Sequence, residues 1–211
     1  MLRLRAMFCL TVPTDAAWVA FAMRDVDAVL RDHAHCEMKA ASNALSLAAR
    51  HPASVALVRA LTDVAREEID HFQRVLAILE RRAIELGTPE VDTYAAELRR
   101  AASGLPRDPA LCALVDRLLV GALIEARSCE RFKLLVEALA HRDEPELSAL
   151  YKELCAAEAR HYRTFVDLAN DAAGGDTARV AARLARLADL EGAIVGRLAD
   201  TSSAPRTTMH G

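Results

Sequence analysis

Apolar residues recur at three- and four-residue steps along most of the chain, which is the spacing that places them on one face of an α-helix. This pattern predicts a short helix from Ala16, capped by Asp15, and a long helix that follows it to about Arg50. Pro52 is expected to begin the next helix, because proline is tolerated in a first turn, and Gly87 ends it. Further stripes predict helices over about 109–140, 146–172 and 177–199, with a shorter one over about 92–102.

Four of these helices are long, and a longer connection separates the second from the third. An all-α four-helix bundle with additional peripheral helices is the packing that this order favours. Composition agrees, because 43 of the 211 residues are Ala, the strongest helix former, against 8 Gly and 7 Pro. We expect a single domain over residues 1–200 and a flexible tail over residues 201–211.

Charge and cysteine content exclude several classes of protein. With 27 basic and 30 acidic residues the net charge is −3, so any contact with nucleic acid must come from a local basic face. The five cysteines are odd in number, scattered and free of any CxxC pair, which argues against a disulfide framework or a thiolate zinc site. No run of 18 apolar residues is free of charge, so we expect a cytoplasmic protein with no membrane partner.

Glutamates interrupt the apolar stripes at matching places. A single Glu37 precedes the motif Glu68-x-x-His71 by 68 − 37 = 31 residues, and a single Glu125 precedes Glu158-x-x-His161 by 158 − 125 = 33 residues. Helical residues three apart lie on the same side of the helix, so each Glu and His can reach one point. A lone Glu followed by Glu-x-x-His, occurring twice, is the ligand pattern of two-metal carboxylate bundles.

Charge balance supports the same interpretation. Four ionised glutamates in an apolar interior would each cost several kcal/mol unless they are compensated, and two divalent cations balance their charge. Oxygen and nitrogen donors suit iron or manganese, whereas the absence of thiolates from the pattern disfavours structural zinc.

Other interpretations of single residues stay open. Either Glu-x-x-His pair alone is compatible with a solvent-exposed helix, and the whole chain with a metal-free helical interaction module. His33 lies one turn before Glu37 and could orient it, although a surface position is favoured; Glu130 is expected at the surface or beside the ligands. Gly121 could leave room for an apolar substrate, but close helix packing is favoured.

Four segments resemble one particular family. CEMKAASNALSL (36–47), REEIDHFQRV (66–75), LIEARSCERF (123–132) and EARHY (158–162) are similar to the bacterial tRNA 2-methylthio-N6-isopentenyladenosine hydroxylases, over about residues 16–172. The resemblance implies a ferritin-like di-iron protein whose iron ligands are Glu37, Glu68, His71, Glu125, Glu158 and His161. Residues 1–10 and the tail match poorly and support no functional inference.

The reaction implied by this resemblance is a monooxygenation. It uses O2 and two electrons, delivered by an electron-donor protein or reductase, to hydroxylate the isopentenyl group of the modified adenosine beside the anticodon of tRNA. Another ferritin-like oxidase or peroxidase is the alternative: a ferroxidase, a rubrerythrin-like protein or a manganese catalase with the same six ligands. Binding of tRNA would need cations, and the candidates are Arg81, Arg82, Arg99, Arg100, Arg107, Arg127, Arg131, Lys133, Arg160 and Arg163.

Overall fold

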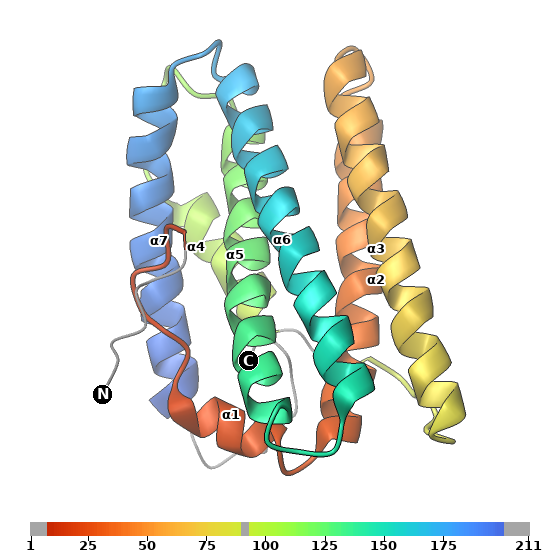
Figure 1. Cartoon of the computed structure of the whole chain (residues 1–211). Coiled ribbons are helices and arrows are strands. Elements are labelled where there is room, and N and C mark those ends of the chain that lie inside the picture. Colours follow the sequence, from red (N-terminus) through yellow and green to blue (C-terminus); the bar gives the residue numbers. More distant parts are fainter. Residues whose placement is uncertain (1–7, 90–92, 201–211) are drawn as a thin grey trace. The chain divides into compact units, whose positions relative to one another are not determined.

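The computed structural model describes residues 8–89 and 93–200, and every regular element within them is a helix (Figure 1). In chain order the helices are α1 (Ala16–Ala22), α2 (Val26–Arg50), α3 (Val55–Arg81), α4 (Thr93–Gly104), α5 (Ala113–Leu139), α6 (Pro145–Ala172) and α7 (Thr177–Asp200). The all-helical prediction is confirmed. The predicted tail at 201–211 lies outside the described residues.

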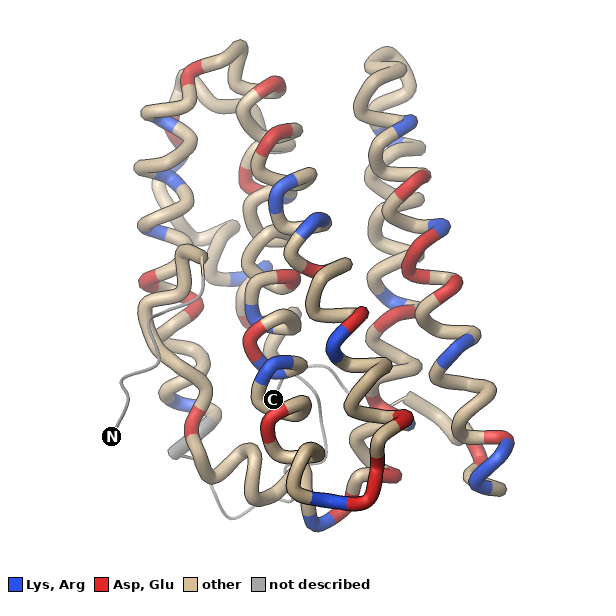
Figure 2. The backbone as a smooth tube through the Cα atoms, in the orientation of Figure 1, with Lys and Arg blue, Asp and Glu red and all other residues tan. Residues whose placement is uncertain are grey.

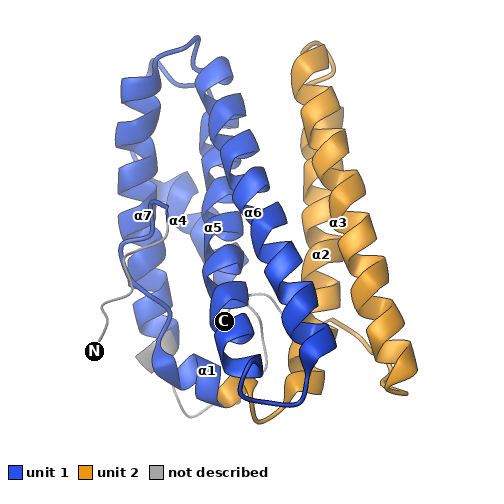
Figure 3. Ribbon diagram, viewed as in Figure 1, with its two compact units in different colours: residues 1–20, 92–206, 210–211 blue, residues 21–91, 207–209 orange. Residues whose placement is uncertain are grey.

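The described residues form two compact units (Figure 3). The first, drawn in orange and labelled unit 2 in Figure 3, contains α2 and α3 and ends before α4. The second, drawn in blue and labelled unit 1 there, contains the segment before α1 and the helices α4 to α7, and α1 crosses the division. Within the first unit α2 packs along α3, and within the second α5 packs along α6 while α7 contacts α4, α5 and α6. That residues 1–200 form one domain therefore stays a prediction.

Polar caps determine where the helices of the first unit begin. The side chain of Asp25 accepts a hydrogen bond from the amide of Ala28 at 2.9 Å, and α2 begins at the next residue, Val26. The Ser54 side chain accepts from the amide of Leu57, so α3 begins at Val55. Pro52 lies in the turn before that cap, and the prediction that it begins the helix was wrong.

In the second unit, α5 also begins later than the periodicity predicted, at Ala113 in place of residue 109. The carboxylate of Asp108 accepts a hydrogen bond from the amide of Ala110 at 3.0 Å, and its carbonyl accepts from the amide of Leu111. These bonds fold residues 108–111 into a turn, which delays the helix.

Gly121 allows α5 and α6 to approach each other closely. A β-carbon built at this position would lie 3.1 Å from the ring of Phe165 on α6. The ring occupies the volume that a side chain would need, so the close-packing interpretation of Gly121 is confirmed.

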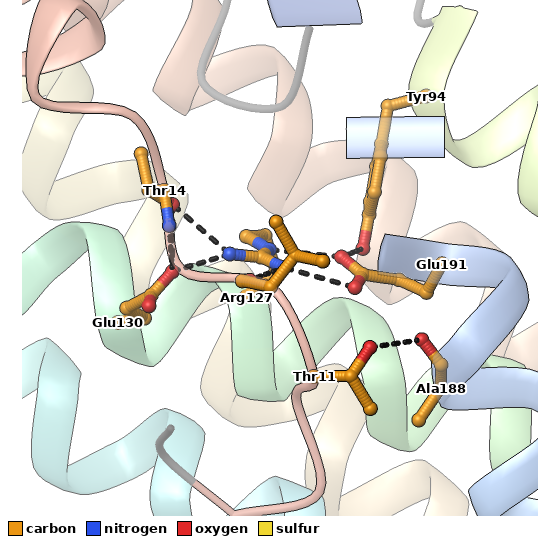
Figure 4. Close-up of polar contacts among 8 residues, drawn as sticks. Thr11, Thr14, Tyr94, Arg127, Glu130, Ala188 and Glu191 are labelled. Atoms are coloured by element: carbon orange, nitrogen blue, oxygen red, sulfur yellow. Dashed lines mark hydrogen bonds and ion pairs between the residues drawn. The ribbon is translucent and has the colours of Figure 1, made fainter. Parts of the chain in front are cut away.

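A buried polar network ties the segment before α1 to α5, α4 and α7 (Figure 4). The guanidinium of Arg127 donates two hydrogen bonds of 2.8 Å to Glu191 on α7, and it also donates to Glu130, to the Thr14 hydroxyl and to the carbonyl oxygen of Val12. The hydroxyl of Tyr94 on α4 donates to Glu191 at 2.9 Å. Buried charges need such complete pairing, so the network fixes how these segments meet.

None of the described helices is both long and apolar enough to cross a membrane.

Candidate metal centre

The first unit brings one predicted triad of ligands together. Glu37 lies on the buried face of α2, and Glu68 and His71 lie one turn apart on the buried face of α3. Each of the three offers a ligand atom within 4.8 Å of the others, and all are at most 5% exposed. His71 Nδ1 lies 3.2 Å from Glu68 Oε2 and 3.5 Å from Glu37 Oε2. This donor set suits one divalent cation.

The second unit brings the other triad together in the same way. Glu125 lies on the buried face of α5, and Glu158 and His161 lie one turn apart on the buried face of α6. Their ligand atoms again lie within 4.8 Å of one another. Two carboxylates and one imidazole on two packed helices therefore occur in each unit, as the repeated motif predicted.

The electrostatics of the first triad match a site that binds cations. Burial, together with the neighbouring charge of Glu68, raises the pKa of Glu37 well above its usual value. Burial alone would lower the pKa of His71, but hydrogen bonds and charges from Glu37 and Glu68 outweigh it and raise that pKa to about 10. Without a metal, the imidazolium partly neutralises the carboxylates; a bound cation would take over this role and displace the proton.

His33 belongs to this cluster, and its predicted surface position was wrong. The side chain is 1% exposed, and its Nε2 lies 2.5 Å from Glu37 Oε1, so one proton lies between them. Burial lowers the pKa of His33 to about 3, which keeps the imidazole neutral. The four-residue spacing to Glu37 was the signal for this contact, but it does not distinguish a buried helix face from an exposed one.

Comparisons with known proteins cover nearly the whole chain. The family model described as tRNA-(MS2IO6A)-hydroxylase (MiaE) matches residues 2–205. The chain belongs to the MiaE family. It is similar to the tRNA 2-(methylsulfanyl)-N(6)-isopentenyladenosine(37) hydroxylase of Pseudomonas putida, with 43% identity over 181 residues that cover 85% of this chain and 83% of that protein. The enzyme of the same name from Salmonella typhimurium is 27% identical over 232 residues, which cover 87% of this chain and 82% of that protein.

A solved structure extends the comparison from sequence to fold. A ferritin-like protein from Synechococcus, described as Protein 43 with aldehyde deformylating oxygenase activity, is similar with a TM-score of 0.85 and 35% identity. The match covers 97% of this chain and 96% of that one. The predicted ferritin-like fold class is thereby confirmed for this MiaE-family chain.

The structure differs from the sequence predictions at three positions that closely follow Glu125 in the sequence. Glu130, predicted at the surface or beside the ligands, is buried and bound by Arg127 and Thr14. Arg127 and Arg131 were candidate RNA contacts, but both are buried; Arg131 lies 4.9 Å from the centre of the Trp18 ring. The segment LIEARSCERF therefore combines a predicted ligand with residues that hold the N-terminal segment, and its charges do not meet solvent.

Proposed function

We propose that this protein is an O2-dependent non-haem di-iron monooxygenase that hydroxylates the isopentenyl group of 2-methylthio-N6-isopentenyladenosine next to the anticodon of tRNA. The match to the tRNA-(MS2IO6A)-hydroxylase family over residues 2–205 carries this proposal. The triads on α2–α3 and α5–α6 offer the carboxylate oxygen and imidazole nitrogen atoms that two iron ions would need as ligands.

The two triads are proposed to act as one centre. Glu37, Glu68 and His71 would bind one iron ion and Glu125, Glu158 and His161 the other, with the two units folded as a single domain over residues 1–200. Four carboxylates then carry −4 against +4 from two ferrous ions, which removes the cost of burying them. The ferritin-like relative supports this arrangement, because its similarity extends over both units.

Bound iron would supply the activation of O2 that no protein side chain provides. The residues of the chain hold and surround it. The glutamates and histidines fix the ions, and His33 orients Glu37 through the hydrogen bond to Oε1. Leu118, Ala122 and Leu154 are buried and lie one or two turns before the proposed ligands on α5 and α6, so they would help to keep water from the bound ions.

Binding of tRNA is proposed to use exposed cations in place of a strongly basic surface. Basic and acidic positions are interspersed along the helices (Figure 2), and the net charge is −3. Of the predicted cations, Arg82 is half-buried and the following are exposed: Arg81, Arg99, Arg100, Arg107, Lys133, Arg160 and Arg163. The prenylated base must leave the single-stranded anticodon loop to reach a helical interior. A reductase and O2 complete the proposed partners, and the cytoplasm is the proposed location because tRNA is modified there.

The test is a reaction with prenylated tRNA. The protein is loaded with ferrous iron, given a chemical reductant, O2 and tRNA that carries the methylthio-isopentenyl nucleoside, and the digested nucleosides are analysed by mass spectrometry. Formation of the hydroxylated nucleoside supports the proposal, and its loss in Glu125→Ala connects it to the second triad. An iron-loaded protein that consumes O2 or peroxide and leaves the nucleoside unchanged would favour the oxidase or peroxidase alternative.

A further inference from the structure

Two cysteines that neither triad uses meet where α5 packs on α6. Cys129 lies on α5 and Cys155 on α6, and their sulfur atoms are 3.2 Å apart. Each sulfur also lies near the carbonyl oxygen of the other residue, at 3.2 Å from Cys129 Sγ to Cys155 O and 3.4 Å from Cys155 Sγ to Cys129 O. Both side chains therefore point at each other across a close helix contact.

From this geometry we propose that Cys129 and Cys155 form a redox-active dithiol that closes to a disulfide between α5 and α6. A disulfide needs the sulfur atoms at about 2.05 Å, so they must approach by only about 1.2 Å. The sequence concealed the pair, because 26 residues separate its members and they form no CxxC motif.

The two thiols differ in accessibility and reactivity. Cys129 is buried, whereas Cys155 is half-buried and reachable by a small oxidant. The hydrogen bond from the Cys129 thiol lowers the pKa of Cys155 to about 7 against the opposing effect of burial, and the charge of Lys133 lowers it further. The same contact and burial raise the pKa of Cys129. Cys155 is thus the thiolate that attacks, and Cys129 is the thiol that resolves the intermediate.

With hydrogen peroxide as the oxidant the steps balance. The Cys155 thiolate attacks one peroxide oxygen, the O–O bond breaks, and hydroxide leaves while Cys155 becomes a sulfenic acid. The Cys129 sulfur then attacks the Cys155 sulfur, the S–O bond breaks, and the hydroxyl leaves as water with the Cys129 proton. Together with the proton that Cys155 gave up, two thiols and one peroxide yield one disulfide and two waters.

The position of the pair suggests where peroxide would arise. Cys129 lies one turn after Glu125, and Cys155 lies one turn before Glu158. An oxygenase that reduces O2 without oxidising its substrate releases hydrogen peroxide. This source of peroxide rests on the proposed function, whereas the proposal that the two thiols form a disulfide does not. The disulfide would form after such uncoupled turnovers, and it would link the two helices that carry the second triad.

Peptide mapping tests the proposal without measuring activity. The purified full-length protein is treated with a small excess of peroxide, quenched with catalase, alkylated and digested with trypsin. Cleavage after Arg127, Arg131, Lys152 and Arg160 isolates the two cysteines on the peptides SCER (128–131) and ELCAAEAR (153–160). We expect these peptides joined, with alkylatable thiols falling from five to three and a mass loss of about 2 Da that dithiothreitol reverses.

Three variants test which cysteine reacts with peroxide and which one completes the disulfide. Cys155→Ser should abolish the linked peptide and leave Cys129 alkylatable, because the buried thiol is not attacked directly. Cys129→Ser should leave a Cys155 sulfenic acid that dimedone traps. Cys112→Ser, which removes an exposed cysteine, should leave the link intact.

Separately alkylated SCER and ELCAAEAR after peroxide treatment would overturn the proposal, as would equal oxidation of Cys112 and Cys155. Because the assay contains no tRNA, its failure leaves the hydroxylase proposal standing, and failure to hydroxylate tRNA leaves the disulfide result standing.

Discussion

Arg127→Met should strongly destabilise the second unit, because it removes the cation that two buried carboxylates share. Glu191 is 0% exposed and Glu130 is 3% exposed. Glu191 loses both of its 2.8 Å hydrogen bonds from the guanidinium, and Glu130 keeps only Thr14 among the partners of Figure 4. Methionine fills most of the volume, so the principal effect is electrostatic.

Removing one partner of a buried ion pair costs about 3–5 kcal/mol, because the remaining charge stays buried. For a chain of this size each kcal/mol lowers the melting temperature by about 2–4 °C, so we expect a decrease of about 6–20 °C. Thermal unfolding followed by far-ultraviolet circular dichroism measures it.

Two comparisons separate the electrostatic cause from a general effect of losing an arginine. Arg179→Met removes an exposed arginine that pairs with Asp108 and Asp176, and it should leave the melting temperature close to that of the wild type. Adding Glu130→Leu and Glu191→Leu to Arg127→Met removes the buried charges and should recover part of the loss. A decrease of less than about 2 °C for Arg127→Met would contradict the electrostatic cause, since it would mean that the buried carboxylates do not depend on the guanidinium.

Three further predictions follow from individual contacts. Gly121→Ala should destabilise the protein by about 1–3 kcal/mol in urea unfolding, because its β-carbon meets the Phe165 ring at 3.1 Å; an unchanged midpoint would show that the ring moves freely. His33→Ala should weaken iron binding by about 10–100-fold in a competition titration, because Glu37 loses the partner that orients it, and unaltered affinity would contradict that role. The alkylation rate of Cys155, measured by peptide mapping, should rise with pH and reach half its maximum near the pKa of about 7, since only the thiolate reacts. An alkylation rate that does not change between pH 6 and pH 8 would contradict the lowered pKa.

The sequence was sufficient for features that repeat locally. Helix period, chain breaks and the three-residue spacing of each Glu-x-x-His pair are short-range properties, so the helices and both triads could be predicted. The start of α5 was missed because the turn at Asp108 depends on side-chain hydrogen bonds that the apolar period does not reveal.

Features that depend on distant partners could not be predicted. Glu130 and Arg127 look like surface charges in the sequence, and their burial follows from Thr14 and Glu191, which lie 116 and 64 residues away. The thiol pair on α5 and α6 was hidden for the same reason. In each case the contact depends on a partner that lies on another segment, and the local sequence pattern does not reveal it.

Iron content shows whether the two triads bind metal. The full-length protein, purified without chelator and reconstituted anaerobically with ferrous iron, is freed of excess metal and analysed for iron per chain together with Glu37→Ala and Glu125→Ala, one variant for each triad. We expect about two iron ions per wild-type chain and a clear loss of metal in each variant, with circular dichroism spectra that match the wild type. A wild-type chain that binds no iron, or variants that both keep two ions, would contradict this expectation.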